Sequence, residues 1–347
     1  MRLLLPPPSP ALRACVVVPV RDEERALPGL VGALDALERP AGWRSDAVEA
    51  VLLLNNCRDG TPGLARRLAE GRPWLRVSEV TLPPPAAHVG RARQLLFDTA
   101  AARLLAAGRP DGWVASTDAD SRPAPDWLVE TDRHDARVGA VGGRVGLVDA
   151  DRAGLAPGVR RLYLLDLAYR RALEWVRSLY DPDPLDPYPR HHQHYGASLA
   201  VRAGAYARAG GMPLVRSSED VALYRALVQA GVAVRHSDRV RVRTSARTAG
   251  RASGGLADAF AWWADCVATR CAVTVESAAD ADARLAKLGR WRQRHAGAPP
   301  ERLSTTPDGG DQEITAAIAG LRARAHALSG LSLAERLAEA RPLARAA

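Results

Sequence analysis

The chain has 347 residues, of which 47% are hydrophobic and 25% are charged. This ordinary globular balance excludes globally disordered and fibrous proteins, and the length suits one large α/β domain with additions, or two domains. No apolar run approaches the roughly 18–20 residues that span a bilayer. The N-terminal apolar run is too short for a secretory signal and the four cysteines form no CxxC pair, so we expect reduced thiols and a cytoplasmic protein.

The net charge of +9 at pH 7 comes from arginine, because Lys287 is the one lysine among 48 basic residues. Together with the high Ala, Gly and Pro content, this skew is typical of a high-GC bacterial genome. A nucleic-acid-binding surface clusters basic residues beside aromatic ones, whereas here the aromatic content is 5% and the arginines are spread along the chain. We therefore expect no nucleic-acid partner, and a pyrophosphate-bearing substrate accounts better for the charge.

Strand and helix patterns alternate through residues 1–145. Short runs rich in β-branched residues predict buried strands, and apolar residues at helical spacing predict the helices between them. The predicted strands cover residues 14–20, 48–54, 75–80, 113–117 and 138–145, and the predicted helices cover 23–37 (with Asp22 as N-cap), 63–70 and 89–107. This order indicates an α/β fold, with a mostly parallel sheet and helices on both faces.

The second half continues with a small-residue stretch at 195–202 that enters another apolar strand, and with an apolar helix that follows Glu219-Asp220. From residue 279 the chain becomes charged and helical, and a linker at 296–312 precedes helices at 313–328 and 332–340. We therefore expect an N-terminal tail at 1–11, a main domain at 12–270 and a C-terminal helical extension at 271–347. The last helices either pack on the domain or a partner subunit, or form a basic amphipathic surface for peripheral membrane contact.

Polar and charged residues gather directly after three of the predicted strands. They form the segments 21–24, 55–61 and 118–121. Taken singly, each has an ordinary explanation, because Asp and Asn favour helix caps and turns. Because the carboxyl ends of parallel strands meet at one edge of a sheet, where α/β proteins bind ligands, the three together indicate a functional site.

Asp118 and Asp120 carry the strongest chemical signal. In an extended segment that leaves a strand, residues two apart point the same way. Two carboxylates on one side suit Mg²⁺ or Mn²⁺, held directly or through water. Such an ion keeps positions open for phosphate oxygens and neutralises charge on a departing diphosphate.

Four segments, in this order and spacing, resemble a known enzyme family. They are ACVVVPVRDEE from Ala14, VLLLNNCRDGT from Val51, STDADS from Ser116 and SSEDVALYRAL from Ser217. Over about residues 12–265 the chain is similar to family 2 glycosyltransferases with the GT-A fold. The resemblance implies a GT-A-like sheet, a nucleotide-sugar donor, a hydroxyl acceptor and a divalent metal, with a nucleotide-sugar half at about 12–122 and an acceptor half at about 123–270.

The resemblance also implies which residues bind the donor and the metal. The Pro-x-x-x-Glu segment of the family falls on Pro19 and Glu23, and its acidic pair after the second strand is replaced by Asn55-Asn56, which still offers hydrogen bonds to a uracil-like edge. The metal-binding Asp-x-Asp falls on Asp118 and Asp120. The expected donor-binding set also includes Arg21, Asp59 and Ala119, which adjoin these motifs.

The Glu-Asp pair of the family, with its Asp as general base, falls on Glu219-Asp220. Acids at a helix start also serve as caps and complement the helix dipole, which is the alternative explanation. The Gln-x-x-Arg-Trp signature of processive polymer synthases is missing, and Thr244-Ser245-Ala246-Arg247 stands in its place. We therefore expect single transfers, and with Asp220 as the base we expect inversion. The transferred sugar is expected to be a hexose.

Two pairs of arginines are further donor-binding candidates. Arg91 and Arg93 lie near the start of a predicted helix, where they would bind a diphosphate or else belong to a solvated face. Arg247 and Arg251 flank a Gly-rich loop that would close over the donor.

A proline-rich loop around the His191–His194 run supplies the acceptor-binding candidates, which are His194, Gly196 and Ala197. A plain polar loop is the alternative. A zinc site is not indicated, because no Cys or distant His pair completes the usual spacing. Completion of the Mg²⁺ or Mn²⁺ shell by His194 or His236 is a further alternative.

Two other functions stay open as alternatives. A sugar-phosphate nucleotidyltransferase would use a similar sheet and metal, but it would place a Gly-rich loop after the first strand, where residues 21–25 contain no glycine. A non-catalytic nucleotide-sugar-binding protein would differ only in lacking turnover. The sequence predicts neither the donor, the acceptor nor the oligomeric state.

Overall fold

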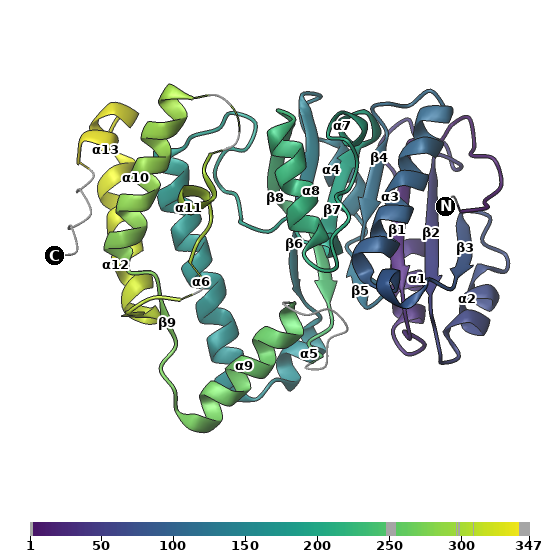
Figure 1. Cartoon of the computed structure of the whole chain (residues 1–347), viewed down its shortest axis with the longest axis horizontal. Coiled ribbons are helices and arrows are strands. Elements are labelled where there is room, and N and C mark those ends of the chain that lie inside the picture. Colours follow the sequence, from purple (N-terminus) through teal and green to yellow (C-terminus); the bar gives the residue numbers. More distant parts are fainter. Residues whose placement is uncertain (1–2, 248–254, 296, 298, 308, 340–347) are drawn as a thin grey trace. The chain divides into compact units, whose positions relative to one another are not determined.

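The computed structural model describes residues 3–247, 255–295, 297, 299–307 and 309–339. The first of its two contact units is built on an eight-stranded mixed sheet with the strand order β3-β2-β1-β4-β7-β6-β8-β5 (Figure 1). In chain order the strands are β1 Ala14–Val20, β2 Val48–Asn55, β3 Leu75–Val80, β4 Trp113–Ser116, β5 Ser121–Pro123, β6 Val138–Leu147, β7 Leu199–Arg202 and β8 Ala233–Thr244.

The predicted parallel sheet is confirmed for the first four strands along the chain. β1 pairs in parallel with β2 and with β4, and β2 pairs in parallel with β3. Val17 of β1 lies opposite Val51 on one side and Ser116 on the other. The β1 residues from Ala14 to Val18 are fully buried, as expected of a strand covered on both faces.

The remaining strands make the sheet mixed. β6 and β8 pair in parallel, whereas β7 runs antiparallel to β4 and β6, and β5 runs antiparallel to β8. As a result, Leu199 at the start of β7 lies opposite Ser116 at the end of β4. The segment that precedes β7 is therefore brought to the carboxyl end of β4, where the sequence places its Asp-x-Asp motif.

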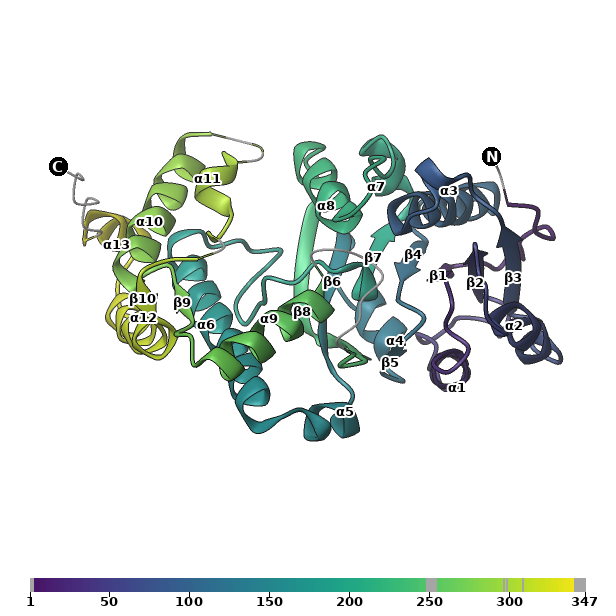
Figure 2. The same ribbon diagram turned by 60° about the horizontal axis from the view of Figure 1, so that its bottom comes forward.

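Helices cover both faces of this sheet, as predicted. Figure 2 shows α3, α7 and α8 on one face and α1, α2 and α4 on the other. Cys15 and Val17 of β1 share a core with Leu96 of α3 and Leu223 of α8. The helices are α1 Leu27–Asp35, α2 Thr61–Ala69, α3 Val89–Ala106, α4 Trp127–Asp132, α5 Asp149–Gly154, α7 Ala203–Arg208 and α8 Glu219–Gln229, with short 3₁₀ turns η1 Pro84–Ala86 and η2 Gly196–Ser198.

The start of α1 differs from the prediction. Asp22 does not cap this helix, because its backbone takes a left-handed conformation with φ of 52° and its Oδ1 accepts a hydrogen bond from the Arg58 backbone N–H at 2.6 Å. The helix starts at Leu27 instead, with Ala26 as its N-cap and Pro28 in its first turn.

The second unit is helical. Its members are α6 Pro157–Tyr180, α9 Leu256–Thr269, α10 Ala278–Arg294, α11 Glu301–Ser304, α12 Ile314–Ser329, α13 Leu333–Glu339 and a two-strand pairing of β9 Thr274–Val275 with β10 Gln312–Glu313. Val176 of α6, Leu288 of α10 and Leu321 of α12 share its core. Polar contacts join the same helices, since the Tyr180 hydroxyl donates to Asp282 Oδ1 at 2.6 Å and Arg324 Nε donates to that oxygen at 2.8 Å.

Contacts group the chain in a different way from the expected boundary at residue 270. Residues 153–192 join the residues from 256 onward, because α6 packs against α9, α10 and α12. The predicted division into functional halves stays a prediction. Within the described residues, no helix is both long and apolar enough to cross a membrane. The four cysteines are free thiols.

Candidate functional site

The carboxyl ends of β1, β2 and β4 lie at one edge of the sheet, as their parallel register requires. Val20 ends β1 opposite Leu54 of β2, and the loop after Ser116 of β4 leaves the sheet beside them. α3 follows β3, so its first turns start at the same edge. The segment before β7 arrives there from the opposite direction. Residues far apart in the sequence therefore meet at this edge.

Hydrogen bonds join the loops after β1 and β2. The Glu24 backbone N–H donates to Asp59 Oδ2 at 3.3 Å, and the Gly60 backbone N–H donates to Glu24 Oε2 at 3.2 Å. Desolvation acts to raise the pKa of Asp59, but hydrogen bonds from Thr61 and from the Glu24 backbone outweigh it, and the pKa lies below its ordinary value. Asp59 is thus an ionised carboxylate that holds two loops together.

The two asparagines at the end of β2, Asn55 within the strand and Asn56 directly after it, lie in different environments. The Asn56 side chain makes two hydrogen bonds to the backbone of Leu82. Its Nδ2 donates to the carbonyl at 2.9 Å, and its Oδ1 accepts from the N–H at 3.1 Å. Asn55 is 4% exposed, and its Nδ2 is a buried donor without a hydrogen-bond partner in the described structure. A buried amide that lacks a partner costs free energy, and a ligand with an acceptor atom would remove that cost.

Arg93 is the centre of the site. Its guanidinium donates from Nε to Glu219 Oε1 at 2.8 Å and from Nη2 to Asp118 Oδ1 at 2.8 Å. Nη1 donates to the Ser116 hydroxyl at 2.5 Å and to the Gly196 carbonyl at 2.9 Å. Burial acts to lower the pKa of Arg93, but the neighbouring carboxylates of Asp118 and Glu219 outweigh burial and raise it. One permanent cation therefore fixes the ends of β4, η2 and α8.

The two carboxylates of the Asp-x-Asp segment are held by different partners. Asp118, whose side chain is 36% exposed, is anchored by Arg93. Asp120 Oδ2 accepts from the Ser245 hydroxyl at 2.7 Å, and its Oδ1 accepts from the Thr244 hydroxyl at 3.3 Å. Ala119 between them is buried, so its side chain lies in the protein interior. Among the described residues no group of three or more His, Cys, Asp or Glu side chains is arranged to hold a metal ion.

Glu219 and Asp220 begin α8 and have distinct surroundings. Glu219 is buried against Arg93, with a side chain 5% exposed. Asp220 is half-buried; its Oδ2 accepts from the Gly196 backbone N–H at 2.8 Å and its Oδ1 from the Val221 N–H at 2.8 Å. Glu219 is thus the buried carboxylate of the pair and Asp220 the more accessible one.

Of the acceptor candidates, Gly196 occupies a position where only glycine fits. A Cβ on Gly196 would lie 2.5 Å from Arg93 Cζ, so only glycine permits this approach of the guanidinium. Ala197 follows in η2 and is buried. His194 stacks on Tyr224 of α8, with ring centroids 4.1 Å apart and planes at 9°, and both rings lie edge-to-face with His236 of β8.

The remaining candidates lie in several places. Arg21 Nη1 donates to the Ala87 carbonyl at 3.1 Å. Glu23 is buried, and its backbone N–H donates to the Thr61 hydroxyl at 2.9 Å. Pro19 is half-buried within β1. Arg91 lies in the first turn of α3 and donates to Gln94 Oε1 at 2.5 Å. Arg247 belongs to the second contact unit, and Arg251 lies outside the described residues.

Sequence reasoning missed three hydroxyl residues of this site. Ser116 binds Arg93, while Thr244 and Ser245 hold Asp120. The alternation Arg239-Val240-Arg241-Val242-Arg243-Thr244 is the strand signal that places Thr244 at the end of β8. Nothing in the local sequence shows that β8 pairs with β5, which brings Thr244 opposite Ser121.

No family model matches this sequence, and no curated protein matches it. Among solved structures, it is similar to the mannosyltransferase PcManGT from Pyrobaculum calidifontis in complex with GDP-Man and Mn²⁺, with 19% identity, a TM-score of 0.47, and coverage of 97% of this chain and 82% of the other. For S. aureus TarS 1–349 in complex with UDP-GlcNAc the identity is 14%, the TM-score 0.47 and the coverage 84% and 69%. For the Mycobacterium tuberculosis glucosyl-3-phosphoglycerate synthase with UDP the values are 18%, 0.38, and 75% and 80%.

Proposed function

We propose that this chain is a metal-dependent glycosyltransferase that moves a hexose from a nucleotide-sugar donor to a hydroxyl acceptor, with inversion and one sugar per reaction. The observation that carries the proposal is the Arg93 network. It joins Asp118, in the motif suited to a metal and a diphosphate, to Glu219, which is 126 residues from Arg93 in sequence and adjoins the base candidate Asp220. One cation therefore connects the proposed metal-binding segment to the start of the helix that carries the proposed base.

The end of β2 supplies the nucleobase contact in this proposal. The unpartnered Asn55 Nδ2 would donate to a carbonyl of a uracil-like or guanine-like base. Asn56 acts indirectly, because both of its amide atoms are used by the Leu82 backbone. Arg91, near the start of α3, would contact the diphosphate.

The Asp-x-Asp segment fits a divalent ion that takes few protein ligands. Asp118 and Asp120 are hard oxygen donors on one loop, and Asp118 is partly exposed. Because the described residues offer no third carboxylate or histidine in a metal-binding cluster, the diphosphate and water would complete the shell, as Mg²⁺ and Mn²⁺ permit. When bound, the ion supplies charge neutralisation for the departing nucleoside diphosphate.

Asp220 is the proposed general base. The N–H groups of Gly196 and Val221 fix its carboxylate, and the N-terminus of α8 favours negative charge there. Asp220 accepts the proton of the acceptor hydroxyl as that oxygen forms its bond to the anomeric carbon. The bond from that carbon to the diphosphate oxygen breaks and its electron pair leaves with the nucleoside diphosphate. A single displacement of this kind inverts the anomeric carbon.

We also propose that the protein is bacterial and that it acts in the cytoplasm. The four free thiols and the arginine-rich composition support it.

A thermal-shift screen of UDP-, GDP- and dTDP-sugars, with and without Mn²⁺, identifies the donor. We expect one donor class to raise the melting temperature in a metal-dependent way. The control variant Asp46→Ala removes an exposed carboxylate far along the chain from the Asp-x-Asp motif, and it should respond as the wild type does. Release of nucleoside diphosphate in the presence of acceptor then establishes turnover. No shift with any nucleotide sugar at millimolar concentration contradicts the proposal. Pyrophosphate release from a nucleoside triphosphate and a sugar phosphate would instead identify a nucleotidyltransferase.

A further inference from the structure

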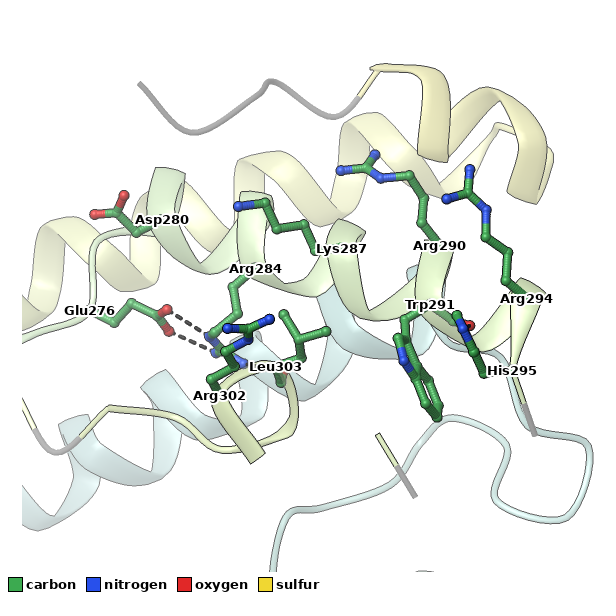
Figure 3. Close-up of a pocket in the computed structure, with 10 residues that line it drawn as sticks. All are labelled: Glu276, Asp280, Arg284, Lys287, Arg290, Trp291, Arg294, His295, Arg302 and Leu303. Carbon is green, nitrogen blue, oxygen red and sulfur yellow. Dashed lines mark hydrogen bonds and ion pairs between the residues drawn. The ribbon is translucent and has the colours of Figure 1, made fainter. Parts of the chain in front are cut away.

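A cavity of about 720 Å³ lies in the second, helical unit, along α10 and beside α11 (Figure 3). It contains no residue of the candidate site. Its volume falls in the range of small-molecule sites and is several times larger than an inorganic phosphate. The cationic side chains that line it are Arg284, Lys287, Arg290, Arg294 and Arg302, and the aromatic ones are Trp291 and His295.

The lining carries an excess of positive charge. Arg284 is neutralised by Glu276, with two hydrogen bonds of 2.7 Å that Figure 3 marks by dashed lines. Lys287, Arg294 and Arg302 are exposed and form no ion pair within the part of the chain that the structure describes. Arg290 donates to the Leu337 carbonyl at 3.0 Å, a neutral partner that leaves its charge uncompensated.

Ordinary helix electrostatics explains this charge only in part. Arg294 lies in the last turn of α10, where a cation complements the helix dipole. Lys287 lies in the middle of α10, so the dipole does not account for it, and Arg302 lies in α11, whose single turn of four residues has only a small dipole. Asp280, the other acid of the lining, is engaged as the acceptor for the Ser277 hydroxyl in the first turn.

An aromatic surface adjoins the cations. Trp291 is half-buried and stacks on His295, with ring centroids 4.9 Å apart and planes at 12°. Guanidinium groups bind phosphate oxygens in pairs, and an indole face beside them offers apolar contact to the group that carries the phosphate. The cavity is thus suited to an anion with an organic part.

We propose that this cavity binds a phosphate ester, either a soluble phosphorylated molecule or the headgroup of an anionic lipid. Lys287 and Arg302, towards one end of the cavity, bind the phosphate oxygens, Trp291 contacts the attached group, and Arg294 adds positive charge at the other end (Figure 3). The proposal does not rest on the proposed transferase function, because none of the residues that line the cavity is a candidate residue of the transferase site.

The test compares the full-length chain with Lys287→Gln/Arg294→Gln/Arg302→Gln. A matched control, Arg39→Gln/Arg208→Gln/Arg322→Gln, removes the same charge at exposed arginines outside the cavity. Calorimetric titration with inorganic pyrophosphate and with glycerol 3-phosphate, in EDTA to silence a metal-dependent donor site, probes soluble ligands. Co-sedimentation with phosphatidylcholine vesicles containing phosphatidylglycerol probes lipid.

We expect the cavity variant to bind the successful probe at least about tenfold more weakly, because it loses two or more charge-assisted hydrogen bonds. The control and Asp120→Ala should bind like the wild type. Binding in the titration alone assigns a soluble ligand, and binding in the vesicle arm alone assigns a lipid headgroup. No binding in either arm, or equal binding by the cavity variant and its control, overturns the proposal.

Discussion

Replacement of Arg93 by Met tests whether one cation organises the site. The substitution keeps an unbranched side chain and removes four hydrogen bonds, to Glu219, Asp118, Ser116 and Gly196. Glu219 is then left as a buried carboxylate, with its side chain 5% exposed and its cation gone.

The expected loss in the free energy of unfolding is about 3–5 kcal/mol, the usual cost of removing one partner of a buried ion pair. Asp118 adds little, because its side chain is 36% exposed and solvent screens its charge. Arg93→Met/Glu219→Gln should recover about 1 kcal/mol or more, since the double variant no longer buries an uncompensated charge.

Chemical denaturation of the full chain, followed by circular dichroism, measures these differences, and thermal shift with the donor measures binding. Arg103→Met is the matched control, because Arg103 forms a similarly buried pair with Glu49, at 2.5 and 2.6 Å, away from the candidate site. Both Arg→Met variants should lose comparable stability, and only Arg93→Met should also weaken donor binding. A cost below about 1 kcal/mol, a double variant no more stable than Arg93→Met, or equal loss of donor binding in Arg103→Met would refute the reasoning.

Further predictions concern four positions around the site. Asp120→Ala should abolish metal-dependent donor binding. Its melting temperature without ligand should stay near that of the wild type, because a half-buried loop acid contributes little to the core. If calorimetry measures the same donor affinity for this variant as for the wild type, the metal assignment is excluded. Asp220→Asn should lower turnover by roughly 10²–10⁴-fold, the usual span for removal of a general base, while donor binding is retained. Near-normal turnover, or an NMR spectrum that shows a product of retained anomeric configuration, would contradict the base assignment. The His88 cap of α3 should be lost in acid, because burial and the nearby arginines lower the pKa of His88 and only its neutral Nδ1 accepts from the Arg91 N–H. The stabilisation by this cap is present above about pH 6.5 and is lost as the pH falls through the lowered pKa. In denaturation between pH 7.5 and 5 the wild type should lose up to about 1 kcal/mol relative to His88→Asn, and parallel pH profiles of the two proteins would argue against the prediction. Gly196→Ala should lose about 1–3 kcal/mol through overpacking against the buried guanidinium, whereas Gly146→Ala, with no atom near its added Cβ, should not.

Local pattern determined the first half of the sheet. β1 and β3 begin and end at the predicted residues, because a run such as Ala14–Val20 has enough buried apolar surface to specify a strand without reference to the rest of the chain. The Asp-x-Asp motif and the Glu219-Asp220 pair could be singled out in the same way, since each lies directly after or at the start of a strongly patterned element.

Strand direction and long-range pairing were decided by tertiary structure. The residues of β7 read equally well as a parallel or an antiparallel strand, and it is the antiparallel pairing with β4 that brings Gly196 to Ser116 and Arg93. The sequence predicted that Arg93, near a helix start, either binds a diphosphate or belongs to a solvated face, whereas the fold buries it in contact with Asp118 and Glu219.

The grouping of α6 with the C-terminal helices has the same origin. The apolar stripe of an amphipathic helix shows that the helix must be covered, and it does not show by what. Val176 of α6 is covered by α10 and α12, more than 100 residues later in the chain. The sequence by itself therefore determined which segments form strands and helices and which carry polar motifs, because these depend on neighbours a few residues apart. Which charges meet, and which helices share a core, depended on contacts between distant segments, and only the tertiary structure decided them.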